Sequence, residues 1–240
     1  MLIVPKTSII SVIIPTLDEA ANLPATLEPL HGVKGVEVIV ADGGSSDATG
    51  AMAEAAGARL VVARTGRASQ QNAGAEVAGG EVLLFLHADT VLPTGFAEAA
   101  RATLAQPEVV LGAFCLGIDG EGWGLRLVER LADWRSRCLQ MPYGDQALFL
   151  RRETFISLGG FPEQEIMEDF ELVRRLKKLG KVELSTLAVQ TSARRWQRLG
   201  VVRTTLLNQL IICGYFLGVS PARLAGWYRG PQAAAVMRSG

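Results

Sequence analysis

Residues 8–19 read SIISVIIPTLDE, an unbroken run of apolar and β-branched residues that is followed directly by two acids. A run without polar alternation is typical of a strand that is buried on both faces, as in the middle of a parallel sheet. The segment lacks a basic leader and a small-residue cleavage site, so we expect a first strand here and not a signal peptide.

Strand and helix signals then alternate, with short connections, as far as about residue 105. This order predicts right-handed crossovers and a doubly wound α/β sheet, in which ligands bind beyond the carboxyl ends of the strands. The later pattern is mixed, and no Pro/Ser-rich linker divides the chain, so we expect one domain over residues 1–240. The expected strands are 8–15, 36–41, 59–63, 81–86, 109–118 and 146–151, and the expected helices are 20–30, 46–56, 68–78, 94–104, 123–138 and 170–179.

The composition excludes several classes of protein. Hydrophobic residues make up 49% of the 240 residues and charged residues 20%, which supplies a continuous core and argues against disorder. The 26 glycines follow no fixed period, and Cys115, Cys138 and Cys213 are scattered without a CxxC pair. We therefore expect no collagen, disulfide scaffold or Cys/His zinc site, and a reducing cytosol fits the cysteine usage best.

Charge and hydropathy mark the C-terminal part of the chain. The 57 residues after Glu183 contain seven arginines and no acid, which indicates either a solvated basic face or an anionic partner such as a phosphate or a lipid headgroup layer. Residues 199–219 are apolar, but their unbroken apolar part is too short to span a bilayer. We expect either a buried or subunit-contact helix here, or an interfacial helix at anionic lipid. The aromatic content of 6%, with no interleaving of basic and aromatic residues, does not favour nucleic-acid binding.

Acidic residues recur where the expected strands end. Asp18 and Glu19 follow the first strand, Asp42 follows the second, and Asp89 follows the fourth. These ends meet at one edge of a parallel sheet, so the sequence predicts a site built from distant segments. Asp47 is more simply a helix cap, and Asp18 and Glu19 either join the site or occupy a first helical turn. Asp42 is suited to accept a hydrogen bond from a base or ribose, and Asp89 to bind a hard divalent cation.

Five motifs resemble the family 2 glycosyltransferases of the GT-A fold. They occur in family order over most of the chain up to about residue 180, and the chain looks most like a bacterial subgroup of small, soluble family 2 transferases. The motifs are VIIPTLDEAANL at 12–23, VIVADGGSSDATG at 38–50, GRASQQNAGA at 66–75, LLFLHADT at 83–90 and MEDFELVRRL at 167–176. The resemblance implies a Rossmann-like, doubly wound mixed sheet with a C-terminal helical extension.

The resemblance also implies roles in binding a nucleotide-sugar donor. By position, Pro15, Thr16 and Glu19 would surround the nucleobase, and Asp42 would accept a hydrogen bond from it. Arg67 would help to hold the nucleotide, while Asn72 and Gly74 would shape the neighbouring turn. Asp89 matches the last acid of the D-x-D motif and would coordinate Mn2+ or Mg2+ at the diphosphate, with Ala88 beside it among the donor-binding residues.

The expected reaction is a single displacement with inversion, in which Asp169 takes the proton of an acceptor hydroxyl. Glu168, next to it, would lie on the acceptor side. Residues 1–105 would bind the nucleotide sugar, residues 106–198 would supply the acceptor and catalytic half, and residues 199–240 would form the helical extension. The donor would be a UDP- or GDP-sugar, the acceptor a hydroxyl that is lipid-linked or otherwise apolar, and the location cytoplasmic, at the inner face of the membrane if residues 199–219 meet lipid.

Two departures from the family pattern leave alternatives open. His87 stands at the first D-x-D position, where it would contact the ribose or a phosphate, or ligate the metal itself. Residues 190–196, QTSARRW, resemble the Q-x-x-R-W signature of processive synthases with one extra residue, so Arg194 and Arg195 would bind the diphosphate or an anionic acceptor, and Trp196 would stack on a sugar or pack. The alternative functions are a sugar-phosphate nucleotidyltransferase and a non-catalytic nucleotide-sugar-binding protein.

Overall fold

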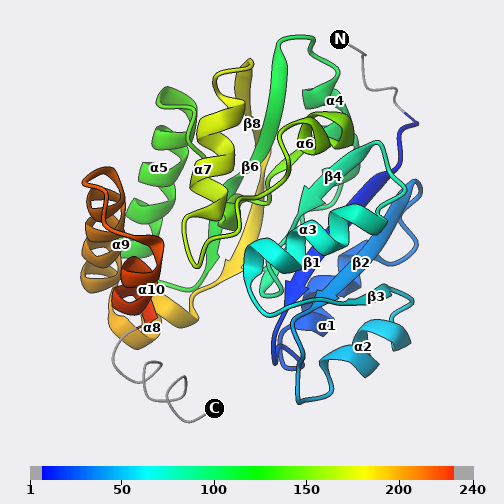
Figure 1. Cartoon of the computed structure of the whole chain (residues 1–240), viewed down its shortest axis with the longest axis horizontal. Coiled ribbons are helices and arrows are strands. Elements are labelled where there is room, and N and C mark those ends of the chain that lie inside the picture. The colour runs from blue at the N-terminus through cyan, green and yellow to red at the C-terminus, as the bar shows by residue number, and fades with distance from the viewer. Residues whose placement is uncertain (1–6, 230–240) are drawn as a thin grey trace.

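The computed structural model describes residues 7–229. In this part of the chain an eight-stranded mixed sheet, in the order β3-β2-β1-β4-β7-β6-β8-β5, has helices on both of its faces (Figure 1). The strands are β1 (Ile10–Thr16), β2 (Val36–Asp42), β3 (Arg59–Val62), β4 (Val82–Phe85), β5 (Thr90–Val91), β6 (Val109–Asp119), β7 (Phe149–Arg151) and β8 (Lys181–Ser192). The α-helices are α1 (Leu23–Leu27), α2 (Thr49–Ala55), α3 (Arg67–Val77), α4 (Phe96–Leu104), α5 (Trp123–Cys138), α6 (Arg152–Ser157), α7 (Glu168–Leu176), α8 (Arg194–Leu199), α9 (Val201–Phe216) and α10 (Pro221–Arg229), and the 3-10 helices are η1 (Glu28–Leu30) and η2 (Gly144–Gln146).

The strand β1 is central in the N-terminal half because its residues are apolar on both faces. It pairs in parallel with β2 and β4, and β2 pairs in parallel with β3. Ile10, Val12 and Ile14 pack in a core with α1 and α4, whereas Ile13 packs in a second core with α3 and α7. Alternate residues of one strand thus contact two layers of helices, and the predicted doubly wound arrangement is confirmed.

Several elements differ from the prediction. The expected helix over residues 20–30 is only α1 followed by η1, so Asp18 and Glu19 lie in the preceding loop and not in a first helical turn. The strand expected over 146–151 is confined to β7, and the helix expected over 170–179 is α7, which begins two residues earlier. The strands β5 and β8 and the helix α6 were not predicted. The missed strand β8 pairs in parallel with β6 and antiparallel with β5, and it forms part of the site described below.

Up to Arg229, the last residue described, three helices follow β8 and gather on one side of the molecule (Figure 1). The expected continuous segment 199–219 is divided, because Gly200 has a φ of +81° and separates α8 from α9. Within residues 7–229, no helix is both long enough and apolar enough to cross a bilayer.

A first prediction concerns Gly74 of α3. A Cβ atom at this position would lie 2.5 Å from Ile13 Cγ2 of β1, in a core that cannot open without moving the sheet. Gly74→Ala is therefore expected to lower the free energy of unfolding by about 1–3 kcal/mol through overpacking. Gly50→Ala in α2 is the matched control, since its nearest neighbour would be an ordinary 3.4 Å away, and it should be neutral or stabilising. Equal urea midpoints for the two variants would contradict this account.

Candidate active site

A cavity of about 840 Å³ lies beyond the carboxyl ends of β1 and β4, between these strands and the C-terminal helices. This volume is within the usual range for sites that enclose a small molecule or cofactor. The lining includes most of the predicted site residues: Pro15, Thr16, Glu19, Arg67, His87, Ala88, Asp89, Glu168, Asp169, Arg194, Arg195 and Trp196. These side chains come from distant segments of the sequence and line one cavity, as predicted. Asp42 and Asn72 are not among the lining residues.

Asp42 lies behind the cavity wall, where its carboxylate is fully engaged. Thr16 Oγ1 donates to its Oδ1 at 3.1 Å, the Gly44 and Ser45 amides donate to its Oδ2 at 3.0 and 2.8 Å, and the Ser45 hydroxyl also donates to it. Burial alone would raise the pKa of Asp42, but these hydrogen bonds outweigh it and lower the pKa. In this structure Asp42 therefore orders the turn after β2 and holds Thr16, which does line the cavity.

Gln70 is a lining residue that the sequence analysis missed. Its Nε2 donates to the carbonyls of Thr16, at 2.6 Å, and Ala41, at 2.9 Å, and so joins the ends of β1 and β2 to α3. A Cβ at Gly43 would lie 3.0 Å from this amide, which explains a glycine directly after Asp42. The signal was present in the GRASQQNAGA motif, but nothing in the sequence distinguishes Gln70 from its neighbour Gln71.

Asn72 holds a different loop from the one predicted. Its Nδ2 donates to the Phe161 carbonyl and its Oδ1 accepts from the Phe161 amide, both at 2.9 Å. A Cβ at Gly160 would lie 2.6 Å from Asn72 Oδ1, and Gly160 has a φ of +75°. Asn72, which was expected among the donor-binding residues at the neighbouring turn, therefore anchors the chain that leads to α7 and is not among the residues that line the cavity.

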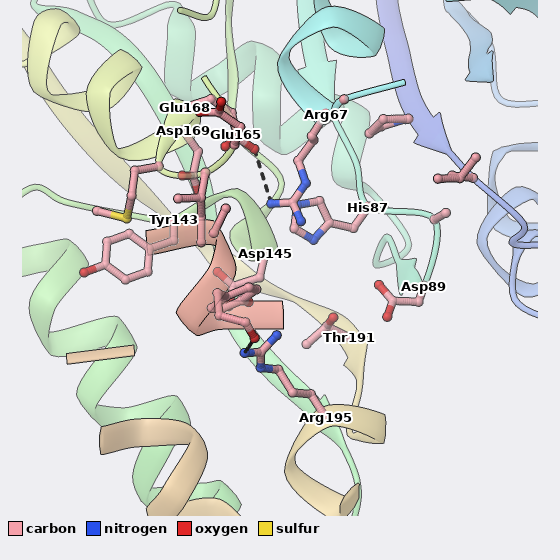
Figure 2. A pocket seen from close by; sticks show the side chains of 18 of the residues that line it. Arg67, His87, Asp89, Tyr143, Asp145, Glu165, Glu168, Asp169, Thr191 and Arg195 are labelled. Atoms are coloured by element: carbon pink, nitrogen blue, oxygen red, sulfur yellow. Dashed lines mark hydrogen bonds and ion pairs between the residues drawn. The ribbon is translucent and has the colours of Figure 1, made fainter. Parts of the chain in front are cut away.

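Arg67 and Glu168 form an ion pair at the cavity wall, with Arg67 Nη1 3.3 Å from Glu168 Oε1 (Figure 2). The Glu168 side chain is only 3% exposed. Its burial and the nearby Asp169 carboxylate raise its pKa, against the opposing effect of Arg67. Burial would lower the pKa of Arg67, but the surrounding carboxylates, Glu168 first, raise it overall. Arg67 is therefore a permanent positive charge next to the carboxyl groups of Glu168 and Asp169.

His87 is half-buried beside Arg67 (Figure 2), and its buried Nε2 has no hydrogen-bond partner within residues 7–229. Burial lowers its pKa to about 4; Arg67 adds to this shift, and the carboxylates of Asp89 and Asp169 oppose it. A neutral imidazole with a free nitrogen can accept a hydrogen bond or ligate a metal ion.

A second prediction follows from this low pKa. The unfolded chain takes up the His87 proton near pH 6.5, whereas the folded chain takes it up only near pH 4. Stability is therefore fully present above pH 6.5 and falls as the pH decreases toward 4. In a proton NMR titration, the His87 ring signal should shift near pH 4, with the exposed His31 as the reference signal. His87→Gln should flatten the pH dependence of unfolding; a His87 midpoint near 6.5 would contradict the prediction.

Asp169 lies in the first turn of the helix α7 and is oriented by two backbone amides. Gly144 N donates to its Oδ2 at 2.6 Å, and Phe170 N donates to its Oδ1 at 2.7 Å. Met167, just before the helix, has a φ of +70°, a conformation that is uncommon for a residue with a side chain. A Cβ at Gly144 would lie 3.0 Å from Asp169 Oδ2 and 3.1 Å from His87 Nε2, so a glycine is required between these two groups.

Asp145 and Thr191 also line the cavity and were not predicted (Figure 2). Asp145 Oδ1 is buried without a hydrogen-bond partner in the described part of the chain, and burial raises the pKa of its carboxyl group. Thr191 lies on the missed strand β8 and accepts a hydrogen bond from Thr90 at 3.0 Å. Asp145 lies in η2, just before the strand expected over 146–151, and Thr191 lies where no strand was expected.

Asp89, at the other side of the cavity, is paired with an arginine from α8. Arg194 Nη2 lies 2.8 Å from Asp89 Oδ2 and 3.5 Å from Glu19 Oε2. The hydrogen bond to Asp89 is the main reason that the pKa of Arg194 is raised. Because half of the Arg194 side chain is exposed, such a pair contributes only about 0–1 kcal/mol and can be exchanged for another partner.

Arg195 and Trp196 continue this wall. The Arg195 guanidinium lies 3.5 Å above the centre of the Tyr228 ring of α10. Trp196 lines the cavity and also packs against the apolar cluster around Leu116 and Leu125. The two alternatives for Trp196, stacking and packing, are therefore compatible.

The fit of a divalent metal ion depends on Asp89 and His87. Within residues 7–229 there is no group of three or more His, Cys, Asp or Glu side chains that could hold a metal ion. Mg2+ is commonly bound by one or two carboxylates, with substrate phosphates and water as the other ligands. The free His87 Nε2 and the exchangeable Asp89 carboxylate, two residues apart, fit an ion of that kind when a diphosphate is present.

The sheet order and a cavity beyond its carboxyl ends define the class of GT-A glycosyltransferases. A mannosyltransferase, PcManGT from Pyrobaculum calidifontis, solved with GDP-Man and Mn2+, matches with a TM-score of 0.62 at 22% identity, over 76% of this chain and 56% of its own. Glucosyl-3-phosphoglycerate synthase from Mycobacterium tuberculosis, solved with Mn2+, UDP and glucosyl-3-phosphoglycerate, also has a TM-score of 0.62, at 23% identity over 86% of this chain and 80% of its own. These likenesses establish the fold.

The family model described as Glycosyl transferase family 2 matches residues 11–158, and the chain belongs to this family. Curated relatives named PGL/p-HBAD biosynthesis glycosyltransferase, from Mycobacterium bovis and Mycobacterium tuberculosis, are 33% identical over 165 residues. That match covers 63% of this chain and 62% of the relatives' length. The resemblance inferred from the five motifs is confirmed.

Proposed function

We propose that this protein transfers a sugar from a UDP- or GDP-sugar to an acceptor hydroxyl, with inversion at the anomeric carbon. The single observation that carries the proposal is the convergence of Asp89, His87 and Asp169 on one cavity that also holds exchangeable arginines. Three proteins of similar structure were solved with a nucleotide or a nucleotide sugar, and two of them also with Mn2+.

The donor would occupy the end of the cavity near β1 and β4. Pro15, Thr16 and Glu19 would contact the base, with the Thr16 hydroxyl held by Asp42 and the Thr16 carbonyl held by Gln70. Asp89 and His87 would hold Mn2+ or Mg2+, which when bound neutralises charge on the diphosphate. Arg194, released from Asp89, is placed to pair with a phosphate oxygen, because arginine binds phosphate in the same fork geometry as carboxylate. Arg67 keeps positive charge near the reacting carbon.

Asp169 would act as the general base. The acceptor oxygen forms its bond to the anomeric carbon as the bond to the diphosphate oxygen breaks, and the diphosphate leaves with that electron pair. The hydroxyl proton passes to Asp169, whose oxygens are aimed by the Gly144 and Phe170 amides. Glu168 is buried and paired with Arg67, so it is less available for this proton.

The acceptor would enter from the opposite end of the cavity, which is apolar. Ile166, Met167 and Phe170 from the α7 region and Ile211 and Ile212 of α9 line this end and pack together in one apolar cluster. Apolar walls next to the base favour an acceptor whose hydroxyl is attached to an apolar body, such as a lipid-linked one. Residues 1–105 would then supply most of the donor contacts, with Arg194 as a later addition, and the segments between 106 and 198 would supply the general base and acceptor side.

The test is a panel of nucleotides and nucleotide sugars, with and without Mn2+. A ligand at one hundred times its Kd stabilises the folded state by about 2.7 kcal/mol, so the correct donor should raise the Tm by roughly 5–10 °C. Release of UDP or GDP on addition of acceptor alcohols would then establish transfer. Release of pyrophosphate from a nucleoside triphosphate and a sugar phosphate would instead establish a nucleotidyltransferase, and donor binding without turnover would favour a binding protein.

A further inference from the structure

Two helices at the side of the molecule present exposed apolar stripes. On α5 the stripe is Trp123, Leu127, Leu131 and Trp134, and on α9 it is Val202, Leu206 and Leu210. The spacing of three and four residues places each set on one helical face. Trp123 is 82% exposed, Val202 73% and Leu206 64%, so these side chains have no cover within residues 7–229. We call these seven residues the α5/α9 surface.

The two stripes belong to one region of the molecule. A Cβ at Gly124 would lie 3.4 Å from Val201 Cγ1, so the start of α5 contacts the start of α9. The exposed Trp123 and Val202 are the direct sequence neighbours of these two contacting residues. Figure 1 shows α5, α8, α9 and α10 together on the side of the molecule that is remote from β2 and β3.

Unpaired basic residues lie on the same two helices. Arg130 of α5 and Arg203 of α9 are exposed and form no ion pair in the described part of the chain. The acids of α5 point inward instead: Glu129 accepts from the Ile118 amide at 2.6 Å, and Asp133 from the Leu116 amide at 3.0 Å. The exposed acids Asp119 and Glu121 lie before the helix begins.

We propose that the α5/α9 surface binds flat on a bilayer that contains anionic lipid. An interfacial helix combines an apolar face with basic residues, and tryptophan is favoured at the level of the headgroups. A second copy of the chain fits this surface less well. A two-fold contact places the same patch against itself, so unpaired arginines would face arginines.

The other side of α9 connects this surface to the cavity. Asn208, Ile211 and Ile212 line the cavity, whereas Leu206 and Leu210 are exposed. A bilayer under α5 and α9 would therefore lie one helix thickness from the apolar end of the cavity. The proposal does not depend on the transfer reaction, because binding to vesicles is measured without donor or turnover.

The test is flotation of the full chain with vesicles of phosphatidylcholine alone or mixed with phosphatidylglycerol. The full chain should float with the anionic vesicles and lose binding at high salt. Arg130→Gln with Arg203→Gln should weaken binding about 25-fold, since each arginine near such a surface contributes about fivefold. Leu127→Gln with Leu206→Gln should weaken it at least about tenfold.

The matched control is Ile156→Gln with Leu179→Gln, two similarly exposed apolar residues on α6 and after α7. This variant should float like the unmodified chain, and circular dichroism should show that all variants are folded. Equal flotation of the α5/α9 variants and the control would overturn the proposal. So would a dimer in light scattering that Leu127→Gln with Leu206→Gln dissociates, because the surface would then be a subunit contact.

Tryptophan fluorescence locates the contact independently. In a variant with Trp196→Phe and Trp227→Phe, the remaining tryptophans are Trp123 and Trp134, both on the α5 stripe. Vesicles with brominated acyl chains should quench this fluorescence. Flotation without quenching would place the bilayer at another surface and would overturn the proposal.

Discussion

Asp169→Asn is expected to lower kcat by between about 100-fold and about 10,000-fold, the range that a positioned general base contributes. Asparagine has nearly the same shape but cannot take up the acceptor proton. The Kd for the donor should change little, because Asp169 contacts backbone amides and the acceptor end of the cavity. Single-turnover sugar transfer gives the rate, and calorimetric titration with the donor gives the Kd.

Asp145→Asn is the informative comparison for Asp169→Asn. Asp145 is a second carboxyl group that lines the same cavity, with an oxygen that has no hydrogen-bond partner in residues 7–229. If Asp145→Asn abolishes transfer while Asp169→Asn preserves it, the base has been assigned to the wrong residue. Thermal unfolding of both variants shows whether a loss of rate reflects a loss of structure, since an asparagine nitrogen at position 169 would face the Gly144 or Phe170 amide.

Asp89→Asn is expected to weaken metal-dependent donor binding by about 100-fold or more, because a bound cation contributes several kcal/mol of charge stabilisation at such a site. The loss should appear as a weaker Mn2+ dependence of donor binding, which a titration of donor at several Mn2+ concentrations measures. In the absence of metal and donor the variant should be nearly as stable as the unmodified chain, since the Asp89–Arg194 pair is half exposed.

Arg194→Gln distinguishes the two proposed partners of Asp89, which are the arginine and the metal ion. Removal of this arginine frees the carboxylate for the metal but also removes a cation that would contact the diphosphate. We therefore expect unchanged or tighter binding of Mn2+ with weaker binding of the donor, opposite in its first effect to Asp89→Asn. Loss of Mn2+ binding in Arg194→Gln would show that Asp89 does not act in the proposed way.

The N-terminal half of the fold was predictable because its signals are local. The runs that form β1, β2 and β4 are mostly apolar. Where such strands alternate with helices along the chain, they are typical of the middle of a doubly wound sheet. The acids that follow these strands are found from the same signals, so Glu19, Asp89 and the region of Asp42 were identified without coordinates. The family motifs then supplied Arg67 and Asp169.

The remaining site residues could not be predicted because their surroundings come from distant segments. Gln70 donates hydrogen bonds to carbonyls of β1 and β2, Asn72 bonds the backbone of Phe161, and Asp145 lines the cavity with a buried Oδ1. The strand β8 has a mixed burial pattern, which gives no clear period for a strand. Its pairing with β6 is what brings Thr191 and Arg194 to the cavity.

The amino-acid order by itself determined a chain with a central apolar strand, acids after successive strands, and the motifs of its family, because each of these depends on residues that are close in the sequence. Only the tertiary structure decided that Asp42 supports the cavity wall without lining it, and that Arg194 forms an ion pair with Asp89. It also decided that α5 and α9 together present an exposed apolar surface. These outcomes depend on which backbone amides and side chains meet across the sheet. Hydrogen bonds and ion pairs act over only a few ångströms, so residues that are far apart in the sequence acquire such partners only when the chain folds and the sheet forms.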